Sequence, residues 1–391
     1  MAPKVIRWGI ISTGGIAEKF AKARQLPFIR DLLVDPSTRD ANDVLHKIAA
    51  IGSRSTSTAE AFIEKLRSSP ASHPSSWGAK HGGLDGCKAF GTYDELYADP
   101  NVDAVYIGTP HTYHHQNTKG ALLGGKHVLC EKPFTLDMEE LDELIAIAKE
   151  RKLFLMEAVW TRFQPIAYAV QDVIHSGKLG KIKRFSADFS ADAKPDSLSS
   201  EDRMIDPKLG GGSLLDMGPY PAVWAMLVLH HHPDNKGSKP PKMLYSHQTV
   251  YPRSKVDSNS RWGLEWEGIG QAQLVTDMQC IGLKEGTCFI QCEEGDLAID
   301  FPPYKPETFH IIPHPAGKEG AIKERTTHHP PGHPGGSMHY EADEVARCIR
   351  DGKLESQRMP LAESRIVQGW FDQVRKAGDT VLKNAKGTAG K

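Results

Sequence analysis

The first 158 residues alternate short apolar runs with segments of helical periodicity, and this alternation constrains the fold more than any other feature. Six runs are predicted as strands, at 5–11, 46–53, 87–90, 102–108, 126–130 and 153–159. Helical patterns lie between them, at about 15–26, 57–68, 93–98, 114–124 and 137–151. Strands that alternate with helices form parallel sheets, because each parallel connection needs a crossover. Six strands also suit a doubly wound nucleotide domain, so we predict an α/β Rossmann domain over residues 1–158.

After about residue 159 the apolar residues recur at period two, as in "IKRFSADFS" and "GTCFIQCE". Antiparallel strands with one exposed face have this pattern. One helix at 212–231 interrupts the strands, and helices at 338–352 and 361–381 follow them. A chain of 391 residues is too long for one core. We therefore expect a second, α+β domain over 159–391 with an open, mostly antiparallel sheet, whose exposed face favours a homodimer.

The composition excludes several classes of protein. Charged residues make up 25% of the chain and the formal net charge is −1, with no basic block, so no nucleic-acid partner is expected. No apolar run approaches the roughly 20 residues that span a bilayer, and the N-terminus lacks a secretory pattern. This predicts a cytoplasmic protein without a membrane partner. Six cysteines lack a zinc-like pair and are expected to be reduced, and the histidine-rich stretches 229–233 and 326–339 lack ligand spacing, so no metal is predicted.

The stretch "WGIISTGGIAEKF" has the strand, glycine turn and helix of a pyrophosphate site. The motif G-x-G-x-x-G/A fits it as Ser12, Thr13, Gly14, Gly15, Ile16 and Ala17. Gly14 lets the backbone approach a phosphate, and Ala17 is small enough for the helix to pack on the strand. Ser12 stands where the first glycine is usual. A serine can take this position if its φ is negative. Its hydroxyl either fills the turn or, like that of Thr13, donates to phosphate.

The end of the second strand indicates which dinucleotide would bind. An NAD site usually has an acidic residue there, which accepts from the ribose 2′-hydroxyl. This chain instead has Ser53, Arg54 and Ser55. A cation and two hydroxyls suit a 2′-phosphate, so NADP is favoured over NAD. The alternative is that Arg54 is an ordinary surface arginine.

Three further stretches complete a recognisable set: "VYIGTPHTYHHQN", "GGKHVLCEKPF" and "GGGSLLDMGPYPAVW". With the glycine turn, they resemble the glucose–fructose oxidoreductase / inositol dehydrogenase (Gfo/Idh/MocA) family over essentially the whole chain. "FLMEAVWTRF" and "EADEVARCIRDGKLES" are most similar to its branch of dimeric dihydrodiol dehydrogenases and fungal NADP-dependent D-xylose 1-dehydrogenases. Many relatives have histidine at the Tyr220 position and an aspartate three residues later. Val223 stands there in this chain, which fits that branch and not an inositol-type site.

The residues themselves indicate a hydride-transfer site. Removing hydride from a carbinol carbon requires a group that takes the hydroxyl proton, and a tyrosine does so near neutral pH only if a cation lowers its pKa. Lys132, in the E-K-P after the fifth strand, can supply the cation, while Asp216 and Tyr220 are four residues apart and share a helix face. The resemblance implies the same roles, with Lys132 and Tyr220 as the proton-handling pair and Asp216 beside them. The alternatives are a surface lysine, a core tyrosine and an aspartate paired with a neighbour.

Other candidate residues surround this set. Those expected at the cofactor are Thr109, Pro110, His111, His114 and Glu131, and those expected at the substrate are Trp160, Arg162 and Arg203. Each substrate candidate has packing or surface exposure as its alternative. The resemblance implies NADP-dependent oxidation of the anomeric hydroxyl of D-xylose to D-xylonolactone as the function. Two alternatives stay open: a trans-dihydrodiol or other sugar dehydrogenase of the same family, and a non-catalytic NADP-binding regulator.

Overall fold

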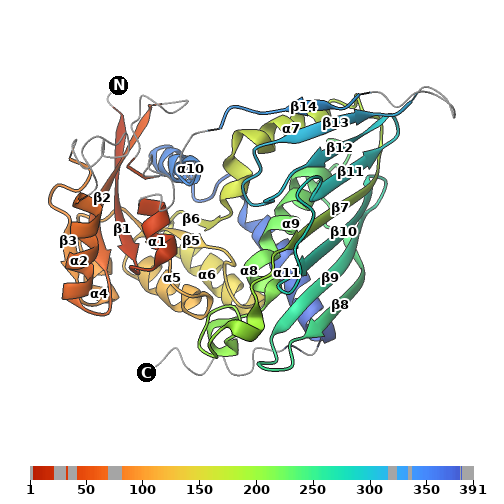
Figure 1. Ribbon diagram of the computed structural model, residues 1–391. Coiled ribbons are helices and arrows are strands. Elements are labelled where there is room, and N and C mark those ends of the chain that lie inside the picture. Colours follow the sequence, from red (N-terminus) through yellow and green to blue (C-terminus); the bar gives the residue numbers. More distant parts are fainter. Residues whose placement is uncertain are drawn as a thin grey trace. The chain divides into compact units, whose positions relative to one another are not determined.

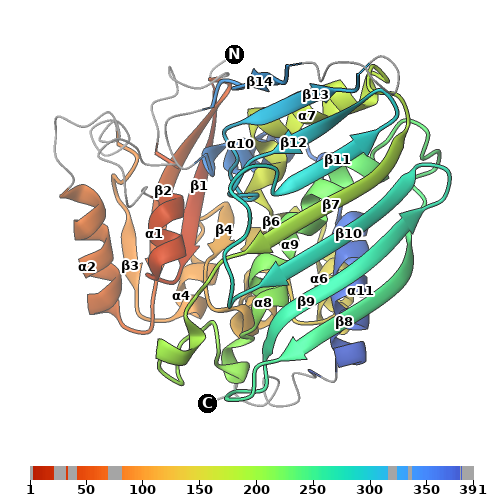
Figure 2. The same ribbon diagram turned by 45° about the vertical axis from the view of Figure 1, so that its right-hand side comes forward.

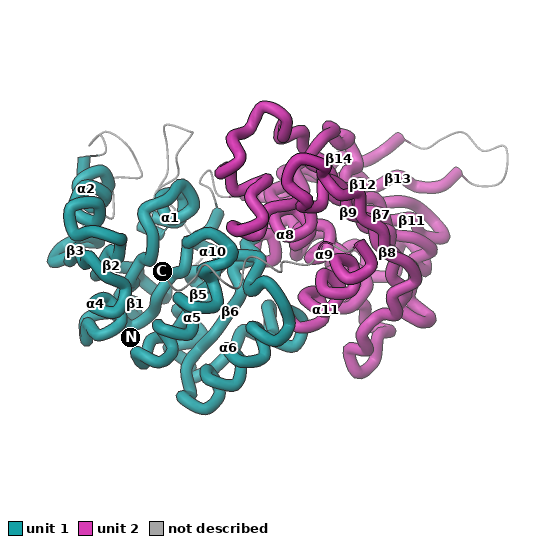
Figure 3. Tube along the Cα trace, turned by 90° about the horizontal axis from the view of Figure 1, so that it is seen from below, with its two compact units in different colours: residues 1–160, 333–364 teal, residues 161–332, 365–391 magenta. Residues whose placement is uncertain are grey.

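The computed structural model describes residues 3–21, 32–33, 42–68, 82–315, 324–332, 337–378 and 380. The chain forms two compact units (Figure 3): unit 1 comprises residues 1–160 and 333–364, and unit 2 comprises 161–332 and 365–391. The expected division at 158/159 lies close to the first crossing. The structure differs in the last third of the chain, because residues 333–364 return to unit 1.

Unit 1 contains a six-stranded parallel sheet with the order β3-β2-β1-β4-β5-β6 (Figure 1). Its strands are β1 (Lys4–Ile11), β2 (Val44–Gly52), β3 (Lys88–Phe90), β4 (Ala104–Ile107), β5 (His127–Glu131) and β6 (Leu155–Ala158). The prediction of a six-stranded Rossmann sheet is confirmed. The strand order reverses between β1 and β4, and this is the point at which doubly wound sheets bind their ligands.

Helices connect these strands: α1 (Gly15–Ala21), α2 (Thr56–Arg67), α4 (Tyr93–Ala98), α5 (His114–Leu123) and α6 (Met138–Arg151). The last of these helices begins after a capping residue. Asp137 is the cap, since its carboxylate accepts a hydrogen bond from the Glu140 amide at 3.0 Å. Two longer connections of this unit, residues 27–45 and 67–86, are expected from their composition to be surface insertions, and most of each lies outside the described residues.

Unit 2 contains an eight-stranded sheet with the order β14-β13-β12-β11-β7-β10-β9-β8 (Figure 2). Its strands are β7 (Ile182–Ser190), β8 (Lys242–Val250), β9 (Asp257–Trp266), β10 (Gly270–Asp277), β11 (Cys288–Cys292), β12 (Gly295–Ile299), β13 (Phe309–Pro313) and β14 (Thr326–His328). Only β7 and β10 pair in parallel, so the mostly antiparallel sheet is confirmed.

Helices of unit 2 cover one face of this sheet (Figures 1 and 2). They are α7 (Pro165–His175), α8 (Ser213–Met217), α9 (Pro219–Ala225), a π-helical turn over Met226–His230, and α11 (Leu361–Gly378), which begins in unit 1. Within the described part of unit 2, no helix covers the opposite face.

Besides the three-residue strand β14, two elements of unit 2 are absent from the sequence prediction. The first is α7, whose apolar face contains Ile166, Val170 and Ile174. The second is β9, whose first half is polar although it is buried. Its polar side chains have partners on neighbouring strands or in α8; Asn259, for example, donates to the carbonyl of Thr276 on β10 at 2.9 Å. A period-two apolar pattern therefore does not reveal this strand.

None of the helices in the described ranges is both long and apolar enough to cross a bilayer. All six cysteines are free thiols. Cys130, Cys288, Cys292 and Cys348 are buried, Cys87 is partly buried and Cys280 is exposed.

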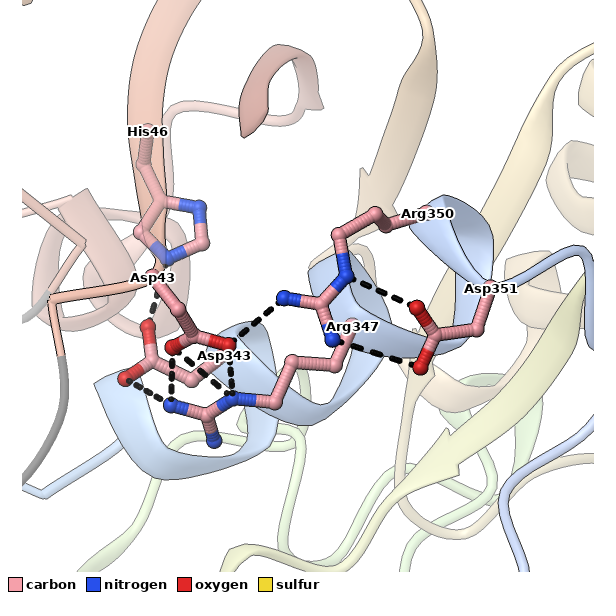
Figure 4. Close-up of polar contacts among 6 residues, drawn as sticks. All are labelled: Asp43, His46, Asp343, Arg347, Arg350 and Asp351. Atoms are coloured by element: carbon pink, nitrogen blue, oxygen red, sulfur yellow. Dashed lines mark hydrogen bonds and ion pairs between the residues drawn. The ribbon is translucent and has the colours of Figure 1, made fainter. Parts of the chain in front are cut away.

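The segment that returns to unit 1 carries α10 (His339–Arg350), which polar contacts join to β2 (Figure 4). Asp43, just before β2, accepts two hydrogen bonds from Arg347 Nε (3.1 and 3.2 Å) and one from each of Arg347 Nη2 (2.9 Å) and Arg350 Nη1 (2.6 Å). His46 Nε2 lies 2.8 Å from Asp343 Oδ1, and its Nδ1 accepts from the Trp8 indole at 3.1 Å. His46 therefore presents its proton on Nε2 to Asp343, and α10 is tied to the parallel sheet of unit 1 at two positions.

We expect Asp43→Asn to lower the free energy of unfolding by about 1 kcal/mol at pH 7, because the amide keeps the shape and loses the charge. The Asp43 side chain is 38% exposed, and solvent screening limits the effect. The hydrogen bond from Arg347 lowers the pKa of Asp43 well below its usual value. The stabilisation is therefore present above the unfolded pKa of about 4 and is lost as the pH falls through the lower, folded value.

Urea unfolding at several pH values tests this expectation. The difference between wild type and variant should be constant from pH 7 to 5 and should shrink below about pH 4. The control is Asp351→Asn, since Asp351 binds only its neighbour Arg350 among the described ion pairs. Equal losses in the two variants, or a difference that grows in acid, would contradict the role of Asp43.

Candidate functional site

The glycine turn after β1 has the backbone geometry of the motif despite its serine. Ser12 has a φ of +88°, so this serine occupies the turn without the negative φ expected as the condition for its fit. Its amide donates to the Gly52 carbonyl at 3.1 Å, and its hydroxyl accepts from the Gly14 amide at 3.1 Å. The turn thus requires the left-handed region that glycine tolerates best, and the serine hydroxyl compensates by bonding within the turn.

The rest of the motif lies where a phosphate site needs it. Thr13 and Ile16 are partly buried, while Gly14 and Gly15 are exposed. Ala17 is buried, and a Cβ placed on Gly108 would lie 3.4 Å from the Ala17 Cβ. The small residues therefore allow α1 to pack against the end of β4.

The three residues after β2 have different surroundings. Ser53 is buried, and Ser55 caps α2 by accepting from the Thr58 amide at 3.2 Å. Arg54 between them is exposed. Burial raises the pKa of Tyr93, and the positive charge of Arg54 opposes this rise, so the guanidinium lies near that phenol. Arg54 is the member of the trio that is available to an anionic ligand.

The buried side chain of His114 contacts the backbone that follows β4. His114 is fully buried, with Nδ1 2.7 Å from the Pro133 carbonyl oxygen and Nε2 2.9 Å from the Thr109 carbonyl oxygen. Burial lowers the pKa of His114, and a neutral imidazole can donate to only one of these two oxygens. His114 therefore connects the backbone after β4 to the backbone after β5. Pro110 is exposed and His111 is partly exposed at the same turn.

The E-K-P motif follows β5. Glu131 is only 6% exposed, whereas Lys132 is partly exposed. Burial raises the pKa of Glu131, and the Tyr106 hydroxyl and the charge of Lys132 oppose the rise. The Lys132–Pro133 peptide bond is cis. Lys132 thus follows a buried acid at the carboxyl end of the parallel sheet.

In unit 2, a buried carboxylate anchors the helix that carries Asp216. Asp257 Oδ2 accepts hydrogen bonds from the Ser213 hydroxyl (2.7 Å), the Leu214 amide (2.8 Å) and the Ser260 hydroxyl (2.8 Å). Burial raises the pKa of Asp257, and these donors oppose the rise. A Cβ on Gly212, whose φ is +113°, would lie 2.2 Å from Asp257 Oδ1, so the carboxylate fits there only because residue 212 is glycine.

The structure brings three predicted site residues together in unit 2. Arg203 Nη1 donates to Asp216 Oδ1 at 2.8 Å. The charge of Asp216 raises the pKa of Arg203, and Tyr220 also contributes, so the phenol lies in the same electrostatic neighbourhood. Asp216 and Tyr220 follow one another in the nearly continuous helices α8 and α9, joined by Gly218 in helical conformation. The Arg203 side chain is 56% exposed and that of Asp216 is 18% exposed, so this pair borders on solvent.

Aromatic rings surround Tyr220, and the sequence did not single them out. The Tyr220 centroid is 5.6 Å from that of Phe189 and 5.5 Å from that of Tyr304. Phe301 lies 6.0 Å from Phe189 in the same cluster. In the sequence, Phe189 is an ordinary inward-facing strand residue and Tyr304 lies in a Pro-rich loop, so no local pattern identifies either one.

Two predicted substrate residues, Trp160 and Arg162, lie on either side of the boundary between the units, which falls after residue 160. Trp160, the last residue of the first segment of unit 1, is partly buried. Arg162, in unit 2, is 1% exposed. Arg162 is therefore a buried side chain in this structure.

The residues of unit 1 fit a dinucleotide. An exposed glycine turn follows β1, a cation follows β2, and both lie at the carboxyl edge of the sheet beside the reversal of strand order. Among the described residues, no three His, Cys, Asp or Glu side chains are grouped as metal ligands.

Family models match both units. The model described as "Oxidoreductase family, NAD-binding Rossmann fold" matches residues 6–159, and the "GFO/IDH/MocA C-terminal domain" matches residues 168–298.

Individual relatives match almost the whole chain. The "D-xylose 1-dehydrogenase (NADP(+))" of Hypocrea jecorina is 35% identical over 96% of this chain and 93% of its own. The trans-1,2-dihydrobenzene-1,2-diol dehydrogenase of Sus scrofa is 30% identical over 95% and 96%. Among solved structures, KijD10, a 3-ketoreductase from Actinomadura kijaniata in complex with NADP, superposes with a TM-score of 0.73 at 25% identity, covering 96% of this chain and 98% of its own.

The Ser12 backbone makes a testable prediction. We expect Ser12→Gly to be more stable than Ser12→Ala by about 1 kcal/mol, because both lose the hydroxyl and only alanine keeps the cost of positive φ. Thermal and urea unfolding of the two variants measure the difference. A Gly variant that is no more stable than the Ala variant would show that this turn does not hold residue 12 at positive φ.

Proposed function

We propose a function for this chain from the premise that it belongs to the Gfo/Idh/MocA oxidoreductase family: it is an NADP-dependent dehydrogenase that oxidises the anomeric hydroxyl of D-xylose to D-xylonolactone. The observation that carries the proposal is the full-length similarity to an NADP-dependent D-xylose 1-dehydrogenase. Arg54 and the exposed glycine turn support the choice of NADP. Thr109, Pro110 and His111 belong to the proposed cofactor site, with His114 holding their turn in place.

The proposed chemistry uses two side chains for one proton. When bound, the nicotinamide accepts the hydride that leaves C1 of the sugar. Tyr220 accepts the proton of the C1 hydroxyl, and the Lys132 ammonium lowers the cost of negative charge on the phenol. Asp216, held by Arg203, orients the hydroxyls of the substrate. Trp160 and the rings beside Tyr220 offer planes for a sugar face.

A dihydrodiol substrate is the second candidate. It is favoured by the 30% identity to trans-1,2-dihydrobenzene-1,2-diol dehydrogenases and by the aromatic cluster of Phe189, Tyr220, Phe301 and Tyr304. A cyclic diol and a pyranose offer similar vicinal hydroxyls and similar apolar faces to such a cluster.

We also propose a homodimer formed through the face of the unit 2 sheet that the helices of unit 2 leave uncovered. Tyr245 on β8 is exposed. On the neighbouring strands β7 and β11, Arg184 Nε donates to Gln291 Oε1 at 2.6 Å. The molecular mass in solution, by sedimentation, tests the assembly against the 43.1 kDa of one chain.

A substrate panel tests the activity. NADPH formation with D-xylose, D-glucose and a trans-dihydrodiol should give the highest kcat/KM for D-xylose. Lys132→Met and Tyr220→Phe should each lower kcat/KM by about 10²-fold or more, as expected when proton transfer is impaired. No preference for xylose would refute the substrate. Full turnover in both variants would refute the proton-handling pair, and no turnover of any substrate by the wild type would favour a non-catalytic regulator.

Arg54→Ala tests the choice of dinucleotide. Losing a charge-assisted bond to the 2′-phosphate should weaken NADP binding by about 10- to 100-fold and leave NAD binding within about twofold. The matched control is Arg67→Ala, which removes another exposed arginine near the end of α2. Fluorescence titration with both reduced dinucleotides measures the effect. Equal losses for the two dinucleotides would contradict a 2′-phosphate contact.

A further inference from the structure

Two turns at the carboxyl edge of the parallel sheet are joined by side chains of α5. The turn after β4 contains Thr109, and the turn after β5 contains Pro133. His114, the first residue of α5, lies between them, with Nδ1 2.7 Å from the Pro133 carbonyl oxygen and Nε2 2.9 Å from the Thr109 carbonyl oxygen. Three residues later, Asn117 Nδ2 donates to the Thr109 hydroxyl oxygen at 3.1 Å. The first turn of α5 thus carries two side chains that contact the turns.

These contacts lie inside the protein. His114 is 0% exposed, Asn117 is 5% exposed and Thr109 is 8% exposed. A buried polar group that loses its partner is costly, because water does not replace the lost bond. A neutral imidazole donates to only one of the two carbonyl oxygens, and Asn117 supplies a further donor at Thr109. Whichever nitrogen carries the proton, the rigid ring of His114 fills the space between the two carbonyl groups and sets their separation.

The turn after β5 is also held by its neighbouring strands. Glu157, on β6, is 6% exposed, and its Oε1 accepts from the Phe134 amide at 3.2 Å. At the start of the turn, the Lys132 amide donates to Glu131 Oε2 at 3.2 Å. His114 therefore joins the turn after β4 to a turn whose own backbone is already bonded to β5 and β6.

Both turns lie on the same side of the reversal in strand order. Strand β1 lies between β2 and β4, and β5 follows β4 in the sheet. A dinucleotide binds across such a reversal, with one mononucleotide half on each side. Arg54, after β2, is the residue proposed for the 2′-phosphate of the adenosine half. The turns at Thr109 and Pro133 therefore belong to the side of the nicotinamide half.

We propose that His114 and Asn117 are positioning residues of the NADP site: they set the separation of the turns after β4 and β5, between which the nicotinamide half of the cofactor is received. This inference rests on the proposed function for the placement of the two cofactor halves and is independent of the sugar. If the separation is not held, the cofactor has to order the turns as it binds, and this cost lowers its affinity.

Calorimetric titration of the full-length protein with NADP and with adenosine 2′,5′-bisphosphate separates the two halves, because the bisphosphate lacks the nicotinamide. His114→Asn keeps an amide near the position of Nδ1, His114→Gln keeps one near that of Nε2, and His114→Leu keeps neither. We expect the Asn and Gln variants to weaken NADP binding by about 3- to 10-fold and the Leu variant by about 10-fold or more. Binding of the bisphosphate should stay within about twofold in all three variants, since its partners are on the other side of β1.

Asn117→Leu tests the second side chain and should weaken NADP binding by about 3- to 10-fold, again without an effect on the bisphosphate. The matched control is Tyr97→Phe. It removes a buried hydroxyl that has no hydrogen-bond partner among the described residues, on a ring that packs against the other end of α5 at Gly120 and Gly124. Both affinities should be unchanged in this control.

Unchanged NADP affinity in the three His114 variants would overturn the proposal. A parallel loss of bisphosphate binding, or an equal loss in Tyr97→Phe, would also overturn it, because either result indicates a general defect and not a change at the two turns. If His114→Leu fails to fold, the Asn and Gln variants decide. The titrations need no turnover, so absence of activity with D-xylose would refute the proposed substrate and leave this result intact.

Discussion

The parallel pairing of β1 with both β2 and β4 is the constraint on which the proposed cofactor site depends. Because all six strands of unit 1 run in one direction, every strand ends at the same edge of the sheet. The glycine turn, Arg54, the turn at Thr109 and Lys132 each follow a different strand, so a single sheet places four distant sequence motifs along one edge. Residues that look unrelated in the sequence become neighbours through hydrogen-bond register alone.

The alternation of strands and helices also explains how much of the fold could be predicted from the sequence. Six apolar runs separated by helical patterns leave few arrangements, and the strands, the Rossmann sheet and the antiparallel second sheet were predicted from pattern. The backbone at Ser12 was not, because the φ of residue 12 depends on the turn that β1 and α1 impose and not on the identity of the residue. Strand β9 was not predicted, for a related reason. Its buried Asn259 and Ser260 have partners on the neighbouring strands: Asn259 donates to the Thr276 carbonyl on β10, and Ser260 accepts from the Gln248 side-chain amide on β8.

The same limit applies to the candidate site. Lys132, Asp216 and Tyr220 were identified because each lies in a short motif with recognisable neighbours. Tyr106 and Asp257 carry no such signal: one looks like a core residue of a buried strand, and the other like a polar residue near a loop. Their roles exist only where strands pair or helices begin. The structure therefore adds to the candidate site chiefly residues such as Tyr106 and Asp257, which hold a neighbouring side chain or the start of a helix in place.

In each unit, a carboxylate that is buried or partly buried is held by hydrogen-bond donors of the same unit. In unit 1, Glu131 takes donors from Tyr106 and from the Lys132 amide. In unit 2, Asp257 anchors the start of α8, and Asp216 at the far end of that helix is paired with Arg203. An ion whose counter-charge lies within its own unit does not need the other unit to offset its desolvation. The contacts of Glu131 and of Asp216 are thus made within each unit separately.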